Sequence, residues 1–263
     1  MKNWFCNLKL QWKFFVILLS SLLLVFIGAM TTAHMTEQAY TDALYARTMQ
    51  MLMLFGQSVQ AELDDVADVS FSILADNVVQ EKLSEVARDK AGYIEGKETR
   101  DEINNRLTNI FHMRNDISSL RLRAPNGIFF TQTRSGTAVP SELFDRYEQA
   151  MIDAGGRAVW APDETAPGSL FLFRNVREIK DLTLNSIAVM GMRINMDRIV
   201  ANCIQPLLQM DMPLLCAIDF QGSRVYASDE RLLELAHEGD GYWLQEMNGE
   251  AFFCAQHRPL HSE

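Results

Sequence analysis

The chain has 263 residues, of which 48% are hydrophobic and 22% are charged, and its formal net charge is −10. This composition suits a membrane segment followed by one large or two small folded domains. The acidic excess lies in the body of the chain, because residues 1–30 carry only Lys2, Lys9 and Lys13 as charged residues. Phosphate binding requires clustered basic side chains, so we exclude nucleic acid as a partner of this chain.

The four cysteines, which show no CxxC spacing, are Cys6, Cys203, Cys216 and Cys254. Only the last three follow residue 33. This arrangement indicates neither a zinc site nor a disulfide framework. We expect buried free thiols that pack as small hydrophobic groups, with one disulfide among the last three as the alternative. We expect neither a metal site nor a cofactor.

Residues 14–33 form an uncharged apolar segment, FFVILLSSLLLVFIGAMTTA. As a helix, it is about 30 Å long, which matches the hydrocarbon core of a bilayer. The lysines before it predict that residues 1–13 are cytoplasmic and that residues 34–263 are extracytoplasmic. A cleaved signal peptide is the alternative, but its apolar core is usually shorter. We therefore expect an uncleaved transmembrane helix that anchors the chain in the cell membrane.

Residues 34–92 are predicted to form a long helical stalk. Residues 36–86 contain no proline and one glycine, and apolar residues recur there at helical spacing. The positions are Tyr45, Leu52, Val59, Val66 and Ile73, with Phe55, Leu63 and Val69 between them. Asp76-Asn77 is a candidate break before a second helix. The apolar stripe packs either on its own domain or on a second copy of the chain in a parallel homodimer.

The rest of the chain has the pattern of an α+β protein with two antiparallel-sheet modules, over residues 93–205 and 206–263. In the first module we expect helices over 100–112, 141–154 and 197–209, and strands over 117–123, 128–133, 170–179 and 186–195. Ser141 is the expected N-cap of the second helix, and Val159-Trp160 is expected to enter an irregular stretch. In the second module we expect strands over 214–219, 224–227, 242–246 and 251–257, with a helix over 230–238.

Four segments carry a resemblance to a known family: ILADNVVQEKL (73–83), ISSLRLRAPNG (117–127), LFLFRNVREI (170–179) and AVMGMRINMDRIV (188–200). Together with the N-terminal anchor, they resemble the double-Cache, PAS-like sensor region of YesM-type sensor histidine kinases. The resemblance implies an extracytoplasmic region that senses a small molecule in a two-component system. Chemoreceptors and membrane-bound transcription regulators carry similar regions, and a free-standing membrane-anchored binding protein is a further alternative.

Receptors of this family continue through a second membrane helix into a kinase. In this sequence no second long apolar segment follows Ala33, and the chain stops just after the last expected hairpin. The resemblance therefore implies that the second module is incomplete and that the effector is missing.

The resemblance also implies a ligand between the sheet of the first module and the segment that crosses it. By position, the candidates are Arg121, Arg123, Trp160, Phe173 and Arg174. The arginines can pair with a carboxylate or with sugar hydroxyls, and Trp160 can cover a pocket. Alternatively, Arg121 and Arg123 are solvated and Trp160 belongs to the core. The Arg-x-Trp-Tyr run of some amino-acid-binding relatives is absent, which argues against an amino-acid ligand.

No arrangement of residues predicts catalysis. Asp163-Glu164 is the most suggestive acidic pair, but neighbouring acids in a loop rich in proline and glycine are expected to be solvated. His257 and His261 have a helical spacing, yet Pro259 lies between them and no third ligand is near. The common hydrolase, zinc-protease and P-loop motifs are absent. We expect no catalytic residues in this chain.

Overall fold

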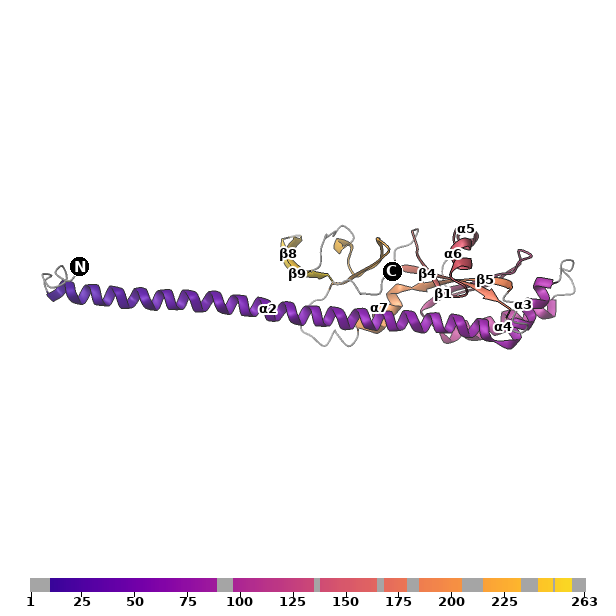
Figure 1. The fold of residues 1–263 in the computed structure, drawn as a ribbon, viewed down its shortest axis with the longest axis horizontal. Helices are drawn as coiled ribbons and strands as arrows, with labels where there is room; N and C mark the ends of the chain where they lie inside the picture. Colours follow the sequence, from indigo (N-terminus) through magenta and orange to yellow (C-terminus); the bar gives the residue numbers. More distant parts are fainter. Residues whose placement is uncertain are drawn as a thin grey trace. The chain divides into compact units, whose positions relative to one another are not determined.

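The computed structural model describes residues 10–88, 97–134, 138–164, 168–178, 185–204, 215–232, 241–247 and 249–256. The chain divides into two compact units, Met1–Met53 with Gly239–Glu263, and Leu54–Glu238. The helix α2 runs without interruption from Leu10 to Ala75 (Figure 1). It therefore contributes residues to both units.

The first unit contains the apolar segment and a hairpin. The part of α2 that begins at Phe14 is long and apolar enough to cross a membrane, and the large side chains of Leu22, Val25 and Phe26 are exposed there. Strands β8 (Gly241–Met247) and β9 (Glu250–Gln256) pair antiparallel, as the sequence predicts. Gly249 between them has a φ of 79°, a left-handed conformation that glycine adopts at no steric cost.

The second unit is built on a five-stranded antiparallel sheet with the order β2-β1-β5-β4-β3. The strands are β1 (Ile117–Arg123), β2 (Phe129–Thr133), β3 (Val159–Pro162), β4 (Ser169–Arg177) and β5 (Ser186–Asn195). The prediction of an irregular stretch at Val159-Trp160 is wrong, because these residues pair with β4 as an edge strand. A branched and an aromatic residue favour a strand, and the prolines and glycine that follow obscured it.

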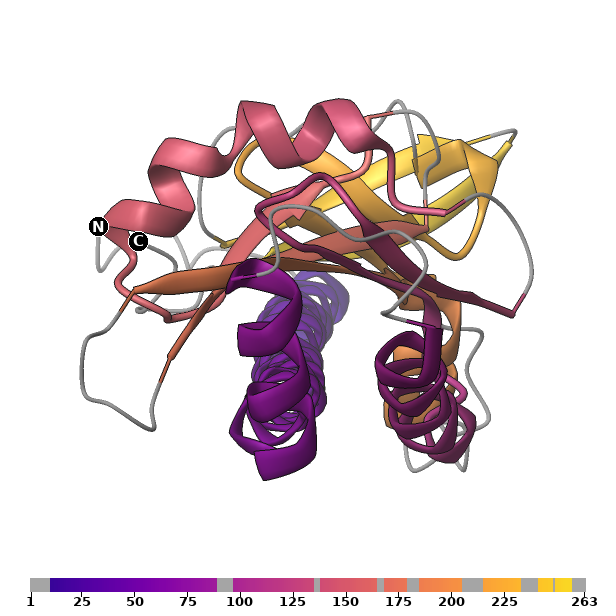
Figure 2. The same cartoon turned by 90° about the vertical axis from the view of Figure 1, so that its right-hand side faces the viewer.

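One face of this sheet is covered by the second half of α2 together with α3 (Asn77–Arg88), α4 (Lys97–Met113) and α7 (Met196–Ile204) (Figure 2). Val59, Val66 and Ile73 are buried in one core cluster with Leu122 and Met190 of the sheet. The stripe on α2 therefore packs on its own domain, as the first of the two interpretations has it. We call this side of the sheet the α2 face.

The opposite face is covered by α5 (Ser141–Arg146) and α6 (Glu148–Asp153) (Figure 2). The prediction of one helix capped by Ser141 is wrong in two respects. The helix is interrupted at Tyr147, and Pro140 occupies the N-cap position without a side-chain hydrogen bond. Ser141 is already the first helical residue, so its hydroxyl is not placed to cap the helix. We call this side of the sheet the α5–α6 face.

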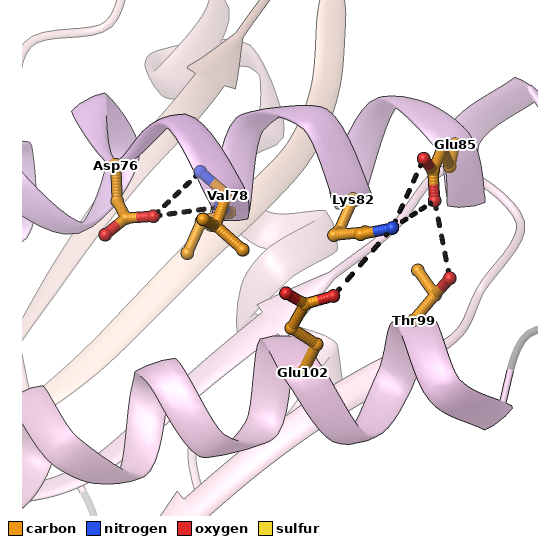
Figure 3. Close-up of polar contacts among 7 residues, drawn as sticks. Asp76, Val78, Lys82, Glu85, Thr99 and Glu102 are labelled. Carbon is orange, nitrogen blue, oxygen red and sulfur yellow. Dashed lines mark hydrogen bonds and ion pairs between the residues drawn. The ribbon is translucent and has the colours of Figure 1, made fainter.

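The predicted break at Asp76 is confirmed. The Asp76 carboxylate accepts hydrogen bonds from the backbone N–H groups of Val78 at 2.9 Å and Val79 at 3.1 Å (Figure 3). The buried Gln80 amide donates to Leu74 O at 2.7 Å and to Arg177 O at 3.1 Å. One side chain thus holds the end of α2 against the end of β4.

Helices α3 and α4 are joined by polar contacts at their surface. The Lys82 Nζ lies 3.2 Å from Glu85 and 3.8 Å from Glu102, and Thr99 donates to Glu85 at 3.3 Å (Figure 3). Exposed ion pairs contribute about 0–1 kcal/mol each. The buried apolar residues of these helices, Val79, Leu83, Ile103 and Leu107, are therefore the main source of their stability.

The second unit also contains the hairpin of β6 (Ala217–Phe220) and β7 (Ser223–Ala227), followed by a 3-10 turn over Glu230–Leu232. Gln221 and Gly222 have φ angles of 49° and 78°, as a tight two-residue turn requires. Gly168 N–H donates to Val225 O at 3.1 Å, which joins β7 to the start of β4. The connection between the strands expected over 170–179 and 186–195 and the ends of the helices expected over 197–209 and 230–238 lie outside the described residues.

Replacing Asp76 with alanine tests the cap at the break. Because the carboxylate accepts two backbone N–H groups, we expect Asp76→Ala to lower the free energy of unfolding by about 1 kcal/mol. Denaturant unfolding of the full chain in detergent, followed by circular dichroism, measures this loss. Asp101→Ala, an exposed acidic position inside α4, is the control and is expected to change stability by less than about 0.5 kcal/mol. Equal effects of the two substitutions would contradict the capping role.

Candidate functional site

Strand alternation places a set of side chains from three neighbouring strands on the α5–α6 face. Arg121 of β1 lies opposite Gly191 of β5, which in turn lies opposite Phe173 of β4. In the next row, Ser119 lies opposite Arg193. Residues two apart on a strand share a face, so Arg123 joins Ser119 and Arg121 on this side. The centre of the sheet therefore presents polar and aromatic groups toward α5 and α6.

An aromatic cluster fills the middle of this face. The ring of Phe144 from α5 lies 5.7 Å from that of Phe173 and 6.0 Å from that of Phe129. Tyr147 stacks on Phe173 at 5.1 Å. A Cβ atom at Gly191 would lie 2.8 Å from Phe144 Cζ, closer than such atoms approach. The absence of a side chain at Gly191 is what allows Phe144 to pack on the sheet.

Four arginines lie over the rings of this cluster. Arg121 lies 3.8 Å above Phe129, and Arg123, Arg146 and Arg193 lie 5.5–5.7 Å from the rings of Phe144, Tyr147 and Phe171, respectively. Three of the arginines are paired with carboxylates, in the pairs Arg123–Asp145, Arg146–Glu164 and Arg193–Asp163. Cations over aromatic faces are stabilised by the ring quadrupole. The face therefore combines positive charge with aromatic surface.

Arg121 differs from the other three. Its Nη1 donates to Val139 O at 2.7 Å, its Nε has no hydrogen-bond partner, and within the described part of the chain it forms no ion pair. Burial lowers the pKa of Arg121 below its ordinary value, and the charge of Glu142 partly opposes this change. The half-buried guanidinium therefore lacks a counter-charge of its own.

The expectation that Asp163 is solvated is wrong. Its side chain is 1% exposed and pairs with Arg193, whose side chain is 12% exposed. Asp163 directly follows β3, and its carboxylate meets Arg193 of β5 on the α5–α6 face, beside Phe171. Glu164 is exposed, as expected, and pairs with Arg146 at 3.0 Å. The Arg193–Asp163 pair was not among the sequence-based candidates, although an arginine inside an apolar strand is a signal that pointed to it.

The structure separates the five predicted ligand-contact residues into two groups. Arg121, Arg123 and Phe173 lie together on the α5–α6 face. Trp160 packs against the core cluster of the α2 face, on the other side of the sheet. Arg174 is buried there and donates to Ala67 O of α2 at 3.3 Å. Phe173 and Arg174 are neighbours on β4, so strand alternation itself requires that they face opposite ways.

The described residues include no group of three His, Cys, Asp or Glu side chains that could hold a metal ion. His257 and His261 lie outside these residues. Cys203, Cys216 and Cys254 are free thiols, and burial raises the pKa of each. Cys203 and Cys216 belong to the core cluster of the α2 face.

The second unit is an α+β domain, with a long N-terminal helix on one face of its antiparallel sheet and short helices on the other. No family model matches the chain. It is 22% identical over 258 residues to the sensor histidine kinase YesM of Bacillus subtilis (strain 168). This match covers 96% of the chain but only 44% of the relative, so the chain spans less than half of that kinase's length.

Solved structures that resemble this chain include chemoreceptor ligand-binding domains. The domain of Campylobacter jejuni chemoreceptor Tlp3 in complex with L-norvaline has a TM-score of 0.51 and 13% identity, over 78% of this chain and 82% of that one. The domain of the Pseudomonas aeruginosa PAO1 amino acid chemoreceptor PctC with GABA has a TM-score of 0.43 and 14% identity, over 75% and 88%. The first likeness supports the fold, and the predicted fold class is confirmed.

Replacing Gly191 with alanine tests the packing of Phe144 on the sheet. We expect Gly191→Ala to destabilise the fold by about 1–3 kcal/mol, because the added methyl group displaces a buried ring. Adding Phe144→Leu removes the clashing Cζ, so the double variant is expected to lose less than the sum of the two single losses. Thermal unfolding of the full chain in detergent measures all three.

Gly56→Ala is the matched control for Gly191→Ala. Gly56 lies within α2 and has no atom within 4 Å of an added Cβ, so alanine there is expected to stabilise the helix by about 0.5–1 kcal/mol. Additive losses at Gly191 and Phe144, or equal effects of the two glycine substitutions, would contradict the proposed contact.

Proposed function

We propose that this chain is the extracytoplasmic signal-sensing region of a membrane-anchored receptor that binds a small molecule. One observation carries the proposal: a single helix, α2, contains the apolar segment and also packs on the back of a sheet whose other face presents arginines and aromatic rings. A ligand that shifts this sheet acts on the same helix that carries the apolar segment. Binding would thereby change the relative population of two helix arrangements.

We place the ligand on the α5–α6 face, in contact with Arg121, Arg123 and Phe173. A carboxylate or the hydroxyl groups of a sugar would use the arginines, and an apolar part would displace or cover the aromatic rings. Trp160 and Arg174 would respond through the sheet, because they lie toward α2. L-norvaline and GABA, the ligands bound to the two chemoreceptor domains, are small carboxylates.

The effector of the whole receptor is also part of the proposal. The relationship to YesM favours a sensor histidine kinase of a two-component system. The likeness of fold to Tlp3 supports a chemoreceptor as the second candidate. A membrane-bound transcription regulator and a free-standing membrane-anchored binding protein are further alternatives, which the sequence that follows Glu263 in the gene distinguishes.

A homodimer through the stalk helix fits this function. The residues of α2 that pack on its own sheet are unavailable for such a contact. Leu54 and Phe71 are 53% and 55% exposed, so a parallel dimer would use this outward side of the helix. Large exposed apolar side chains are typical of protein contacts when they form a continuous patch.

The proposed topology is tested by labelling single introduced cysteines with a membrane-impermeant maleimide. We expect Arg157→Cys, at an exposed position after α6, to react in intact cells, because the residues after 33 are extracytoplasmic. Lys2→Cys is expected to react only after the membrane is permeabilised. The unmodified chain is the control for the native thiols. The reverse pattern, or a mature chain that begins near His34, would refute the proposed anchor.

Ligand binding is tested by hydrogen exchange of the full chain with a panel of sugars and carboxylates. We expect a ligand to slow amide exchange in α5, α6 and β4, because it must order the helices that cover it. Phe173→Leu is expected to reduce this protection, whereas Trp160→Phe, on the α2 face, leaves it unchanged. Protection confined to α3 and α4 would place the ligand elsewhere. If no compound slows amide exchange, the proposed function is contradicted.

A further inference from the structure

The charges of the α5–α6 face are balanced at every arginine except one. Asp145, Glu164 and Asp163 neutralise Arg123, Arg146 and Arg193. Arg121 has a carbonyl oxygen and a ring as its neighbours and no carboxylate bonded to it among the described residues. A cation that is partly removed from water without a partner is unfavourable. Among the described residues, the face therefore has one arginine without a carboxylate bonded to it.

A second group without a partner lies beside it. Ser119 is 1% exposed, and its Oγ has no hydrogen-bond partner in the described structure. Ser119 and Arg121 are two residues apart on β1, so they point to the same face roughly 6.6 Å apart along the strand. Buried hydroxyl groups are nearly always hydrogen-bonded in folded proteins. An unsatisfied donor next to an unpaired guanidinium is the arrangement that a bound anion would complete.

We propose that Arg121 and Ser119 form an anion subsite that binds the carboxylate group of a small organic ligand. This inference rests on the proposed function and names the chemical class of the ligand. A carboxylate supplies one negative charge and accepts hydrogen bonds from both groups. A sugar hydroxyl carries no charge and would leave Arg121 uncompensated. A phosphate dianion would bring more negative charge than one arginine balances.

The surrounding charges favour a single, weakly held negative group. Glu142 of α5 is exposed and forms no ion pair with Arg121 in the described structure. Its negative charge still raises the pKa of Arg121 and so favours the charged guanidinium. It partly offsets the attraction that Arg121 exerts on an incoming anion. The two neighbouring pairs, Arg123–Asp145 and Arg193–Asp163, are each neutral as a unit. Removing the charge of Glu142 is therefore expected to strengthen anion binding, which gives the test a variant of opposite sign.

The first arm of the experiment compares anions with their neutral counterparts on the full chain in detergent. The probes are acetate, propionate, lactate and pyruvate, each against its amide, together with inorganic phosphate, at millimolar concentration and constant ionic strength. We expect the carboxylates to raise the midpoint of thermal unfolding, because a ligand that binds only the folded state stabilises it. The amides, which have nearly the same shape and no charge, are expected to leave the midpoint unchanged.

The second arm measures the affinity for the carboxylate that gives the largest shift in the first arm. The variants are Arg121→Met, Glu142→Gln and Ser119→Ala, and Arg157→Met is the control. Arg121→Met is expected to weaken binding at least about tenfold. Arg157→Met removes the same charge from an exposed position and is expected to leave affinity unchanged. Glu142→Gln is expected to tighten binding by about two- to threefold.

Ser119→Ala separates a binding role from a structural one. Because the hydroxyl has no partner in the described structure, its removal is expected to raise the midpoint of thermal unfolding in the absence of any probe. The same substitution is expected to weaken carboxylate binding by about threefold or more, since it removes a donor to the anion. A purely structural serine would not produce these two opposite changes.

Several results would overturn the subsite. These are equal shifts by carboxylates and amides, a shift with phosphate alone, no shift with any carboxylate, or equal effects of Arg121→Met and Arg157→Met. A neutral sugar that protects α5 and α6 from hydrogen exchange in the Arg121→Met variant would overturn the anion subsite and leave the proposed function standing. If neither a charged nor a neutral compound protects these helices from hydrogen exchange, both the anion subsite and the proposed function are wrong.

Discussion

The burial of one apolar stripe on α2 against the five-stranded sheet determines the arrangement of the second unit. Val59, Val66 and Ile73 have no exposed surface or almost none, and they share a core with Leu120, Leu122 and Met192. Each fully buried aliphatic side chain contributes about 1.5–3 kcal/mol relative to an exposed one. Because the helix occupies one face of the sheet, the polar and aromatic side chains of β1, β4 and β5 that point the other way face the short helices α5 and α6.

That division explains why charge and aromatic surface occur together on the α5–α6 face. The rings of Phe144, Phe173 and Tyr147 exclude water from the sheet, and this raises the cost of the arginines beside them. Carboxylates from two segments, α5 and the residues directly after β3, pair with three of these arginines. The low-dielectric surroundings strengthen the buried Arg193–Asp163 pair, and they make the absence of a bonded carboxylate at Arg121 among the described residues more costly. A sheet face can thus be well packed and still hold a charged group that forms no ion pair within the described structure.

Much of the fold could be predicted from the sequence, because helix and strand periodicity are local. The stripe on α2, the break at Asp76 and the strands β1, β2, β4 and β5 followed from spacing alone. The edge strand β3 did not, because Pro162 and the glycine and proline that follow it dominate the local pattern. For the site, alternation along β4 would have placed Phe173 and Arg174 on opposite faces. The pairing of Arg193 with Asp163 depends on strand order, which no local pattern contains. The same holds for Arg121, which forms no ion pair in the described part of the chain.

The bond from Gln80 to Arg177 O joins residues 97 positions apart in the chain, and this order has a consequence for biosynthesis. During translation, α2 and α3 are completed before any strand of the sheet exists, and β5, which lies in the middle of the sheet, is the last of its strands to be made. Until then the stripe has no surface to cover it, and long-range contacts of this kind form slowly. The nascent chain therefore exposes an apolar helix face for most of the synthesis of the domain, and exposed surfaces of this kind promote aggregation.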